Sequence, residues 1–294
     1  MTLTIILICL IAERFLLEHI HLRNHRWFSR YCQWQLLQNL PDWLQQGLFG
    51  LILLLLPPLL GIAVLQQLFA DSLLGIPAVI FSIGVLLYTL GPEDLDQQIN
   101  QYVSAAEDDD TDARDVARVI IEDEPPTSEP ACSQAVAEAA LQQANRRTSA
   151  VLFWFVILGP LGAMFYRLAT WLPSSDQAAQ DIDFKLNAKQ LLTILDWVPA
   201  RITSFCYAIA GSFEDALYGW RSYQESRHSE FSDSNTGTLI CTGSGAMRLT
   251  TLLDEAYAGA HLYSYLPKAA MALIWRSLIV FLVILTFLTI TGLI

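Results

Sequence analysis

The stretch LDWVPARIT (Leu195–Thr203) lies in a largely apolar run and decides how this chain is arranged. It places an acid, Asp196, and a base, Arg201, on either side of Pro199, where a membrane or core helix favours leucine. Whether this segment crosses a membrane fixes the direction of the neighbouring crossings. The composition of the chain bears on that question first.

The 294 residues are 53% hydrophobic and only 16% charged, whereas a soluble domain has about 25% charged residues. This shortfall predicts a membrane protein. Long apolar runs without interior charge are the criterion for membrane spans. The runs that approach or meet it are Gln45–Leu65, Leu73–Leu90, Ser149–Met164 and Ser277–Ile294, with a weaker one over Met1–Leu17 that lacks the basic start and cleavage site of a signal peptide.

The charges of the chain are unevenly distributed. The net charge is −12, and 14 of the 29 acids lie between Glu93 and Glu138. Nucleic acid is therefore excluded as a partner, since no sizeable basic face is available. The five cysteines are scattered without metal spacing, so neither a disulfide framework nor a zinc site is predicted.

The basic residues predict the orientation of the spans, because cytoplasmic loops are enriched in Lys and Arg. Arg23, Arg26 and Arg30 place the loop after the first span in the cytoplasm. The fourth span should run outward from Arg146-Arg147, and the last should run outward from Lys268 and Arg276. Two consecutive outward spans need an inward crossing between them. The only candidate is Gln190–Phe213, which contains LDWVPARIT, as a span or a re-entrant helix pair.

We therefore expect an all-α, polytopic helical membrane protein with about five to six membrane helices and cytoplasmic helical inserts. Within the acidic insert, helices are expected over 112–122 and 131–147. The regions predicted are a first span with a basic juxtamembrane loop (1–43), a hairpin of two spans (44–92), an acidic cytoplasmic insert (93–148) and a C-terminal membrane region (149–294).

Polar residues at membrane depth are the first candidates for a binding site. A charged side chain there costs about 2.5–3.5 kcal/mol on insertion scales, so Asp196 and Arg201 either pair or line a polar cavity, or they mark an interfacial helix end. Tyr166 and Arg167 lie late in the fourth span. The fork of Arg167 suits an anionic ligand, and its length equally allows it to reach the membrane interface.

Three further patterns favour structural explanations. Glu18, His21 and His25 have the spacing of a two-His-one-carboxylate set, and Asp108, Asp109 and Asp112 form a DDxxD arrangement, but both fit solvated surfaces better. The glycine-rich stretch from Asn235 to Gly245 is either a phosphate-binding loop or, more simply, a helix-capping turn. No catalytic residue, metal site or cofactor is predicted.

Three segments together carry a family resemblance. They are GPLGAMFYRL, DWVPARIT, and SNTG followed by GAMRL, in that order along the chain. The chain resembles the AmpE family of bacterial inner-membrane proteins and the related CobD/CbiB family of cobalamin biosynthesis. The AmpE resemblance implies an accessory or sensor protein in β-lactamase induction. The CobD/CbiB resemblance implies an enzyme that joins an aminopropanol phosphate to a corrinoid carboxylate through an amide bond.

Departures from the enzyme branch favour the AmpE interpretation. QQANRRTS stands where an acidic Glu-Asn…Asp-Gly element is expected, LATWLPSS replaces Asn-Thr-Leu-Asp, and Asp196 replaces an asparagine. We therefore expect a multi-pass protein of the bacterial inner membrane and favour an accessory or sensor role over an enzymatic one, although enzymatic activity stays an open alternative. Its partners would be the lipid bilayer and an anionic small molecule or cell-wall fragment, bound by Asp196, Arg201, Arg167, Tyr166 and Asn235.

Overall fold

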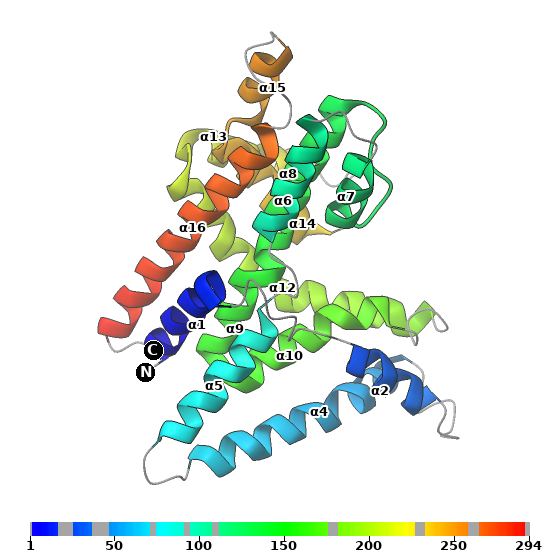
Figure 1. The fold of residues 1–294 in the computed structure, drawn as a ribbon, viewed down its shortest axis with the longest axis vertical. Coiled ribbons are helices and arrows are strands. Elements are labelled where there is room, and N and C mark those ends of the chain that lie inside the picture. The colour runs from blue at the N-terminus through cyan, green and yellow to red at the C-terminus, as the bar shows by residue number, and fades with distance from the viewer. Residues whose placement is uncertain are drawn as a thin grey trace. The chain divides into compact units, whose positions relative to one another are not determined.

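The computed structural model describes residues 2–16, 26–36, 47–70, 75–90, 95–107, 112–175, 182–226, 233–257 and 265–291. Within these ranges the regular structure is entirely helical (Figure 1). The prediction of an all-α fold is confirmed for the described part of the chain. Helices dominate because long stretches of Leu, Ile, Ala and Gln favour them and the chain has few internal breakers.

The chain divides into two compact units. The first comprises Met1–Pro92 and Ala150–Asp196, with Ile294, and the second comprises Glu93–Ser149 and Trp197–Leu293. One helix, α12 (Ile182–Ala210), contributes its first half to the first unit and its second half to the second unit.

The first unit is built from helices around a mainly apolar core. Its other helices are α1 (Thr2–Leu16), α2 (Arg26–Leu36), α4 (Gly47–Ala70), α5 (Ile76–Thr89), α9 (Ala150–Leu158), α10 (Pro160–Trp171) and the 3₁₀ turn η2 (Leu172–Ser174). Helices α4 and α5 contact each other (Figure 1). Buried Leu54, Leu168 and Phe184 bring α4, α10 and α12 into one core.

Two helices are long and apolar enough to cross a membrane, Phe49–Phe69 within α4 and Tyr265–Ile290, which is α16 of the second unit. Only 22% of each apolar window is buried inside the protein. A core helix of a soluble protein would be mostly buried, so these exposed surfaces indicate contact with lipid. The chain is therefore a membrane protein. Two shorter apolar helices, Thr2–Ala12 and Ile76–Thr89, accompany them.

Prolines and glycine shape two of the predicted spans. Pro57 and Pro58 lie inside α4 without ending it. The predicted single span over 149–164 is instead two helices, α9 and α10, which are separated by Gly159. Gly159 adopts φ 66°, a left-handed conformation that favours glycine, and Pro160 begins the next helix with its φ already set.

Most of the segment over 190–213 lies in one helix. Residues 190–210 belong to α12, which has 29 residues and continues through Pro199, and Phe213 begins the next helix. At 1.5 Å per residue this helix is about 44 Å long. The alternative of a re-entrant helix pair is therefore wrong. A single proline inside a helix removes one backbone hydrogen bond, and packing on both sides keeps the helix intact.

The second unit contains the remaining helices. They are α6 (Leu95–Glu107), α7 (Asp112–Ile121), α8 (Glu129–Ala144), the π-helix η1 (Asn145–Ser149), α13 (Phe213–Ser226), α14 (Ser234–Ala246), α15 (Leu249–Tyr257) and α16. The two helices expected in the acidic insert are confirmed as α7 and α8. The predicted helix over 131–147 loses its regular α-form at Asn145, where the π-helix begins.

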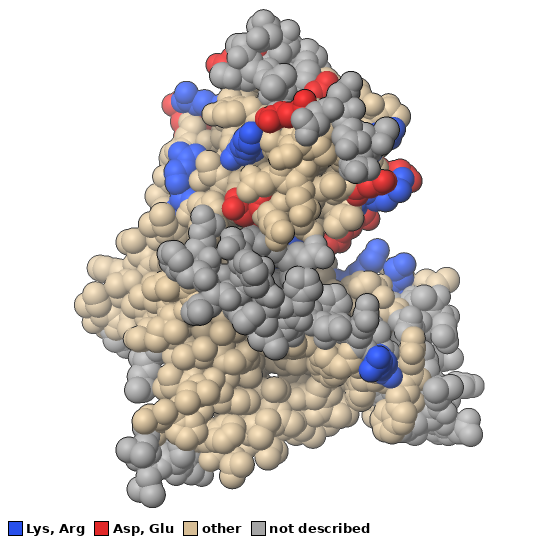
Figure 2. All heavy atoms as spheres, viewed as in Figure 1, with Lys and Arg blue, Asp and Glu red and all other residues tan. Residues whose placement is uncertain are grey.

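Charged side chains gather on the second unit. In Figure 2 most blue and red atoms lie over the part of the molecule where Figure 1 labels α6, α7, α8 and α13. By contrast, α4 and α5 of the first unit contain no Lys, Arg, Asp or Glu. The acidic insert therefore accounts for much of the charge of the protein, and the two hairpin helices present an uncharged surface.

Candidate functional site

The turn between α9 and α10 positions two of the predicted site residues. Gly159 redirects the chain, and a side chain at Gly162 would place its Cβ 2.2 Å from the Trp154 carbonyl oxygen. Only glycine permits that close approach. The resulting direction of α10 buries Tyr166 completely and leaves Arg167 only 4% exposed. The GPLGAMFYRL segment thus turns its polar side chains toward the interior of the first unit.

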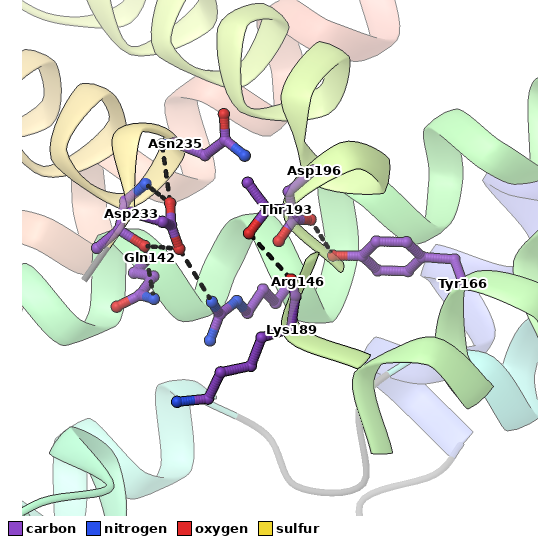
Figure 3. Close-up of polar contacts among 9 residues, drawn as sticks. Gln142, Arg146, Tyr166, Lys189, Thr193, Asp196, Asp233 and Asn235 are labelled. Carbon is purple, nitrogen blue, oxygen red and sulfur yellow. Dashed lines mark hydrogen bonds and ion pairs between the residues drawn. The ribbon is translucent and has the colours of Figure 1, made fainter. Parts of the chain in front are cut away.

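Tyr166 and Asp196 form a buried hydrogen bond. The Tyr166 hydroxyl donates to Asp196 Oδ1 at 2.5 Å, and Asp196 is only 5% exposed (Figure 3). Nearby, Trp154 Nε1 donates to the Leu195 carbonyl at 3.3 Å. A buried carboxylate needs donors because burial removes its water. The bond therefore joins the GPLGAMFYRL and DWVPARIT segments through the side chains that the sequence singled out.

Arg167 binds backbone at the end of another helix. Its Nε donates to the Thr89 carbonyl oxygen at 2.5 Å. Thr89 is the last residue of α5, where carbonyls lack helical partners and the helix dipole is negative. A cation at this position is favourable. The observed contact is therefore structural, and the alternative of Arg167 extending to the membrane interface is wrong, since the side chain is buried.

In the second unit, Arg201 bonds Asn235. Arg201 Nη1 donates to Asn235 Oδ1 at 3.0 Å and to the Trp197 carbonyl at 2.7 Å. The guanidinium also lies 4.2 Å from the centroid of the Trp197 ring, a cation–π arrangement. The PAR part of DWVPARIT is thereby joined to the SNTG segment, in which Asn235 is 3% exposed.

The N-terminus of α14 adds polar groups that sequence reasoning missed. Asp233 caps the helix by accepting from the backbone N–H groups of Asn235 at 2.8 Å and Thr236 at 2.7 Å. Arg146 Nη2 lies 4.0 Å from Asp233 Oδ2, and the Gln142 amide lies 3.0 Å from the Thr236 hydroxyl (Figure 3). Asp before a helix start is a recognisable capping signal. Arg146 was interpreted only as a membrane edge.

Buried hydrogen bonds fix the second half of α12 against α8 and η1. Thr203 Oγ1 donates to Asn145 Oδ1 at 2.9 Å, and Tyr207 donates to the Leu141 carbonyl at 2.8 Å. Both bonds are buried. They hold the register of α12 in the second unit, so the position of Arg201 is set by the fold.

The glycine-rich stretch is neither a phosphate loop nor a capping turn. It forms the body of α14, and its glycines let neighbouring groups approach closely. An added Cβ at Gly237 would lie 2.2 Å from the Tyr223 ring of α13, and one at Gly243 would lie 2.7 Å from Leu141. These glycines serve helix packing, a role that depends on contacts between segments distant in sequence.

The two metal-like patterns fall largely outside the described residues. Glu18, His21, His25, Asp108 and Asp109 are not described, and Asp112 begins α7. Among the residues that the structure does describe, no group of three or more His, Cys, Asp or Glu side chains could hold a metal ion.

Comparison with known proteins gives a family match over most of the chain. The model of the CobD/CbiB protein family matches residues 6–274. A cobalamin biosynthesis protein CobD of Chromobacterium violaceum is 28% identical over 185 residues, 62% of this chain and 58% of that protein. One of Stutzerimonas stutzeri (strain A1501) is 28% identical over 187 residues, 59% of this chain and 60% of that protein. The matched region thus spans about three fifths of each curated relative. No solved structure matches.

These matches overturn the prediction of an AmpE-type protein in β-lactamase induction and antibiotic response. Both relatives are named for cobalamin biosynthesis. The prediction gave too much weight to a few local departures. At one of them, Asp196 for asparagine, a polar side chain is still buried and hydrogen-bonded. A match over residues 6–274 outweighs such differences because it draws on most of the sequence rather than on a few positions.

Proposed function

The chain belongs to the CobD/CbiB protein family, and from this membership we propose that it is a membrane enzyme of cobalamin biosynthesis that forms an amide bond. The family resemblance implies an aminopropanol phosphate as the amine and a corrinoid carboxylate as the acid. Condensation forms the C–N bond, breaks a C–O bond of the carboxylate and releases a proton from the amine, and the carboxylate oxygen would leave on the phosphate that a nucleoside triphosphate supplies, with the nucleoside diphosphate as the other product. Since direct loss of water is unfavourable in water, a nucleoside triphosphate is the class of co-reactant that would activate the carboxylate.

One observation carries the proposal: hydrogen bonds between polar side chains join the segments that carry the family resemblance. Tyr166 bonds Asp196 in the first unit, and Arg201 bonds Asn235 in the second unit. Each segment contributes a side chain that is buried or half-buried, where an unsatisfied polar group is costly. Polar groups retained at such cost, in a chain that has few charges, are suited to ligand binding.

Arg201 and Arg146 are the groups best suited to a phosphate. Arginine presents planar N–H donors that match phosphate oxygens. Arg201 is held by Asn235 and stacks on Trp197, so its guanidinium is pre-oriented. Arg146 lies 4.0 Å from Asp233. Together the guanidiniums of Arg201 and Arg146 and the Asp233 carboxylate carry a formal net charge of +1.

For the first unit we propose that Asp196 binds a donor of the ligand while Tyr166 holds the carboxylate in place. Arg167 differs from the other predicted site residues because its guanidinium caps α5 through the Thr89 carbonyl. We therefore assign Arg167 a supporting role in the fold of this unit.

The family and the apolar helices also support a multi-pass arrangement in a bacterial inner membrane. We propose that α12 crosses the bilayer together with α4, α5 and α16. Along α12 one face exposes large apolar side chains, which suits lipid contact. Their exposed fractions are 71% for Ile194, 53% for Trp197, 38% for Val198, 53% for Phe205 and 46% for Ile209.

Kinetic analysis of Arg201 variants in detergent tests the phosphate assignment. A hydrogen bond to a charged group contributes about 1.5–3 kcal/mol, so Arg201→Ala should raise the KM for the aminopropanol phosphate roughly 10- to 150-fold. Arg201→Lys keeps the charge and loses the planar fork, so its KM should lie between those of the wild type and Arg201→Ala. Arg118→Ala, a change at an exposed arginine of α7, is the matched control and should leave the KM unchanged. An unaltered KM in Arg201→Ala would remove Arg201 from the site.

A further inference from the structure

Helix α2 exposes a stripe of aromatic and basic side chains. Trp27 is 38% exposed and Trp34 is 59% exposed. Arg30 is also exposed, and Tyr31 is half-buried. These residues follow the spacing i, i+3, i+4 and i+7, which places them on one face of a helix. The Tyr31 and Trp34 rings stack with centroids 6.4 Å apart. The Trp27 indole N–H donates to the Tyr88 hydroxyl, which holds the other end of the stripe in place.

The opposite side of α2 fixes its orientation in the first unit. Phe28 is 3% exposed and Cys32 is fully buried, and both belong to the core that contains Leu168. The Phe28 ring packs 5.6 Å from that of Trp171. Because this side is held in the core, the stripe is held outward.

The stripe has the chemistry of a membrane–water interface. Trp and Tyr concentrate there because each has an apolar ring and a polar N–H or O–H group. Helix α2 carries two arginines, Arg26 and Arg30, and no acid, in a chain whose net charge is −12. Long cationic side chains extend to lipid phosphates while their stems stay in apolar surroundings. A positive helix on an acidic protein therefore complements an anionic lipid surface.

We propose that α2 lies in the headgroup region of the bilayer and binds anionic phospholipid through this stripe. The indoles of Trp27 and Trp34 occupy the boundary between headgroups and acyl chains, and the Arg30 guanidinium binds a lipid phosphate. Each arginine near an anionic surface gains about 1 kcal/mol, equivalent to about a fivefold preference over neutral lipid. The site is independent of the proposed amide chemistry, since it uses none of those residues.

Lipid-borne quenchers test where the stripe lies. The full chain is reconstituted in vesicles of phosphatidylcholine brominated on its acyl chains, and wild type is compared with Trp34→Phe. The part of the tryptophan fluorescence that brominated lipid quenches should be smaller in Trp34→Phe than in wild type. Trp220→Phe removes an exposed indole of α13. It gives the same measurement for a tryptophan outside α2. If iodide in the water quenches Trp34 and brominated lipid does not, the stripe faces solvent. If neither quenches it, a protein covers the stripe. Both results overturn the proposal.

The anionic preference is tested with the same signal. Brominated phosphatidylglycerol should quench the Trp34 contribution at about fivefold lower lipid fraction than brominated phosphatidylcholine. In Arg30→Gln the two brominated lipids should quench at similar lipid fractions. Arg118→Gln, at an exposed arginine of the acidic insert, should keep the wild-type difference between them. Equal behaviour of Arg30→Gln and wild type would show that Arg30 binds no lipid phosphate.

Discussion

Replacing Tyr166 with phenylalanine should destabilise the protein by removing the hydroxyl that bonds Asp196. The ring is fully buried, so phenylalanine keeps the packing and removes only the oxygen. The lost bond is short, at 2.5 Å, and its acceptor is a carboxylate that is 5% exposed. Hydrogen bonds to charged groups contribute about 1.5–3 kcal/mol, so we expect a loss of that size in the free energy of unfolding.

The assay is reversible unfolding of the detergent-solubilised protein, followed by helical circular dichroism. Tyr218→Phe is the matched control because Tyr218 is 75% exposed, and it should change stability little. A double-mutant cycle with Asp196→Ala isolates the pair, since removing either partner should remove most of the interaction. We expect a coupling above about 1 kcal/mol. Strictly additive effects would refute the reasoning that this hydrogen bond stabilises the buried carboxylate.

Two further predictions concern the second unit. Gly237→Ala should destabilise by about 1–3 kcal/mol, because its Cβ would meet the Tyr223 ring at 2.2 Å, whereas Gly61→Ala, with nothing within 4 Å, should change the unfolding midpoint little. Burial raises the pKa of Tyr102 above its ordinary value, so the stability that it contributes is complete below about pH 10 and declines at higher pH as the unfolded chain ionises. Thermal unfolding at about pH 9 and pH 11 should therefore show a smaller alkaline loss in Tyr102→Phe than in wild type, and equal losses would contradict this assignment.

The sequence predicted those elements whose signal is local. The helix over 47–70 follows from the apolar run predicted over 45–65, and α7 and α8 follow from helix-forming residues on either side of the proline-containing segment EDEPPTSEP. The break at Gly159 was missed although a glycine and a proline stand together, because the apolar run continues across them. Local composition does not reveal that a glycine redirects a helix within such a run.

Contacts between distant segments were beyond local reasoning. The local sequence predicts a loop or a capping turn at Gly237, whereas its role in packing depends on Tyr223, which lies in another helix. The sequence predicts that Asp196 and Arg201 either pair, line a polar cavity or mark an interfacial helix end. The structure gives each a hydrogen-bonding partner on a different helix, Tyr166 and Asn235. The polar residues themselves were recognisable, because a membrane protein retains few of them, but their partners follow only from the fold.

The most direct test of the central claim is product formation by the purified protein. The full chain in detergent is incubated with an aminopropanol phosphate, a corrinoid carboxylate and a nucleoside triphosphate, and the corrinoid is analysed by mass spectrometry. The account predicts a corrinoid whose mass rises by that of the amine less one water, formed only when all three are present. Absence of this product, in a preparation that is folded and still binds the aminopropanol phosphate, would contradict the claim that the chain is an amide-forming enzyme.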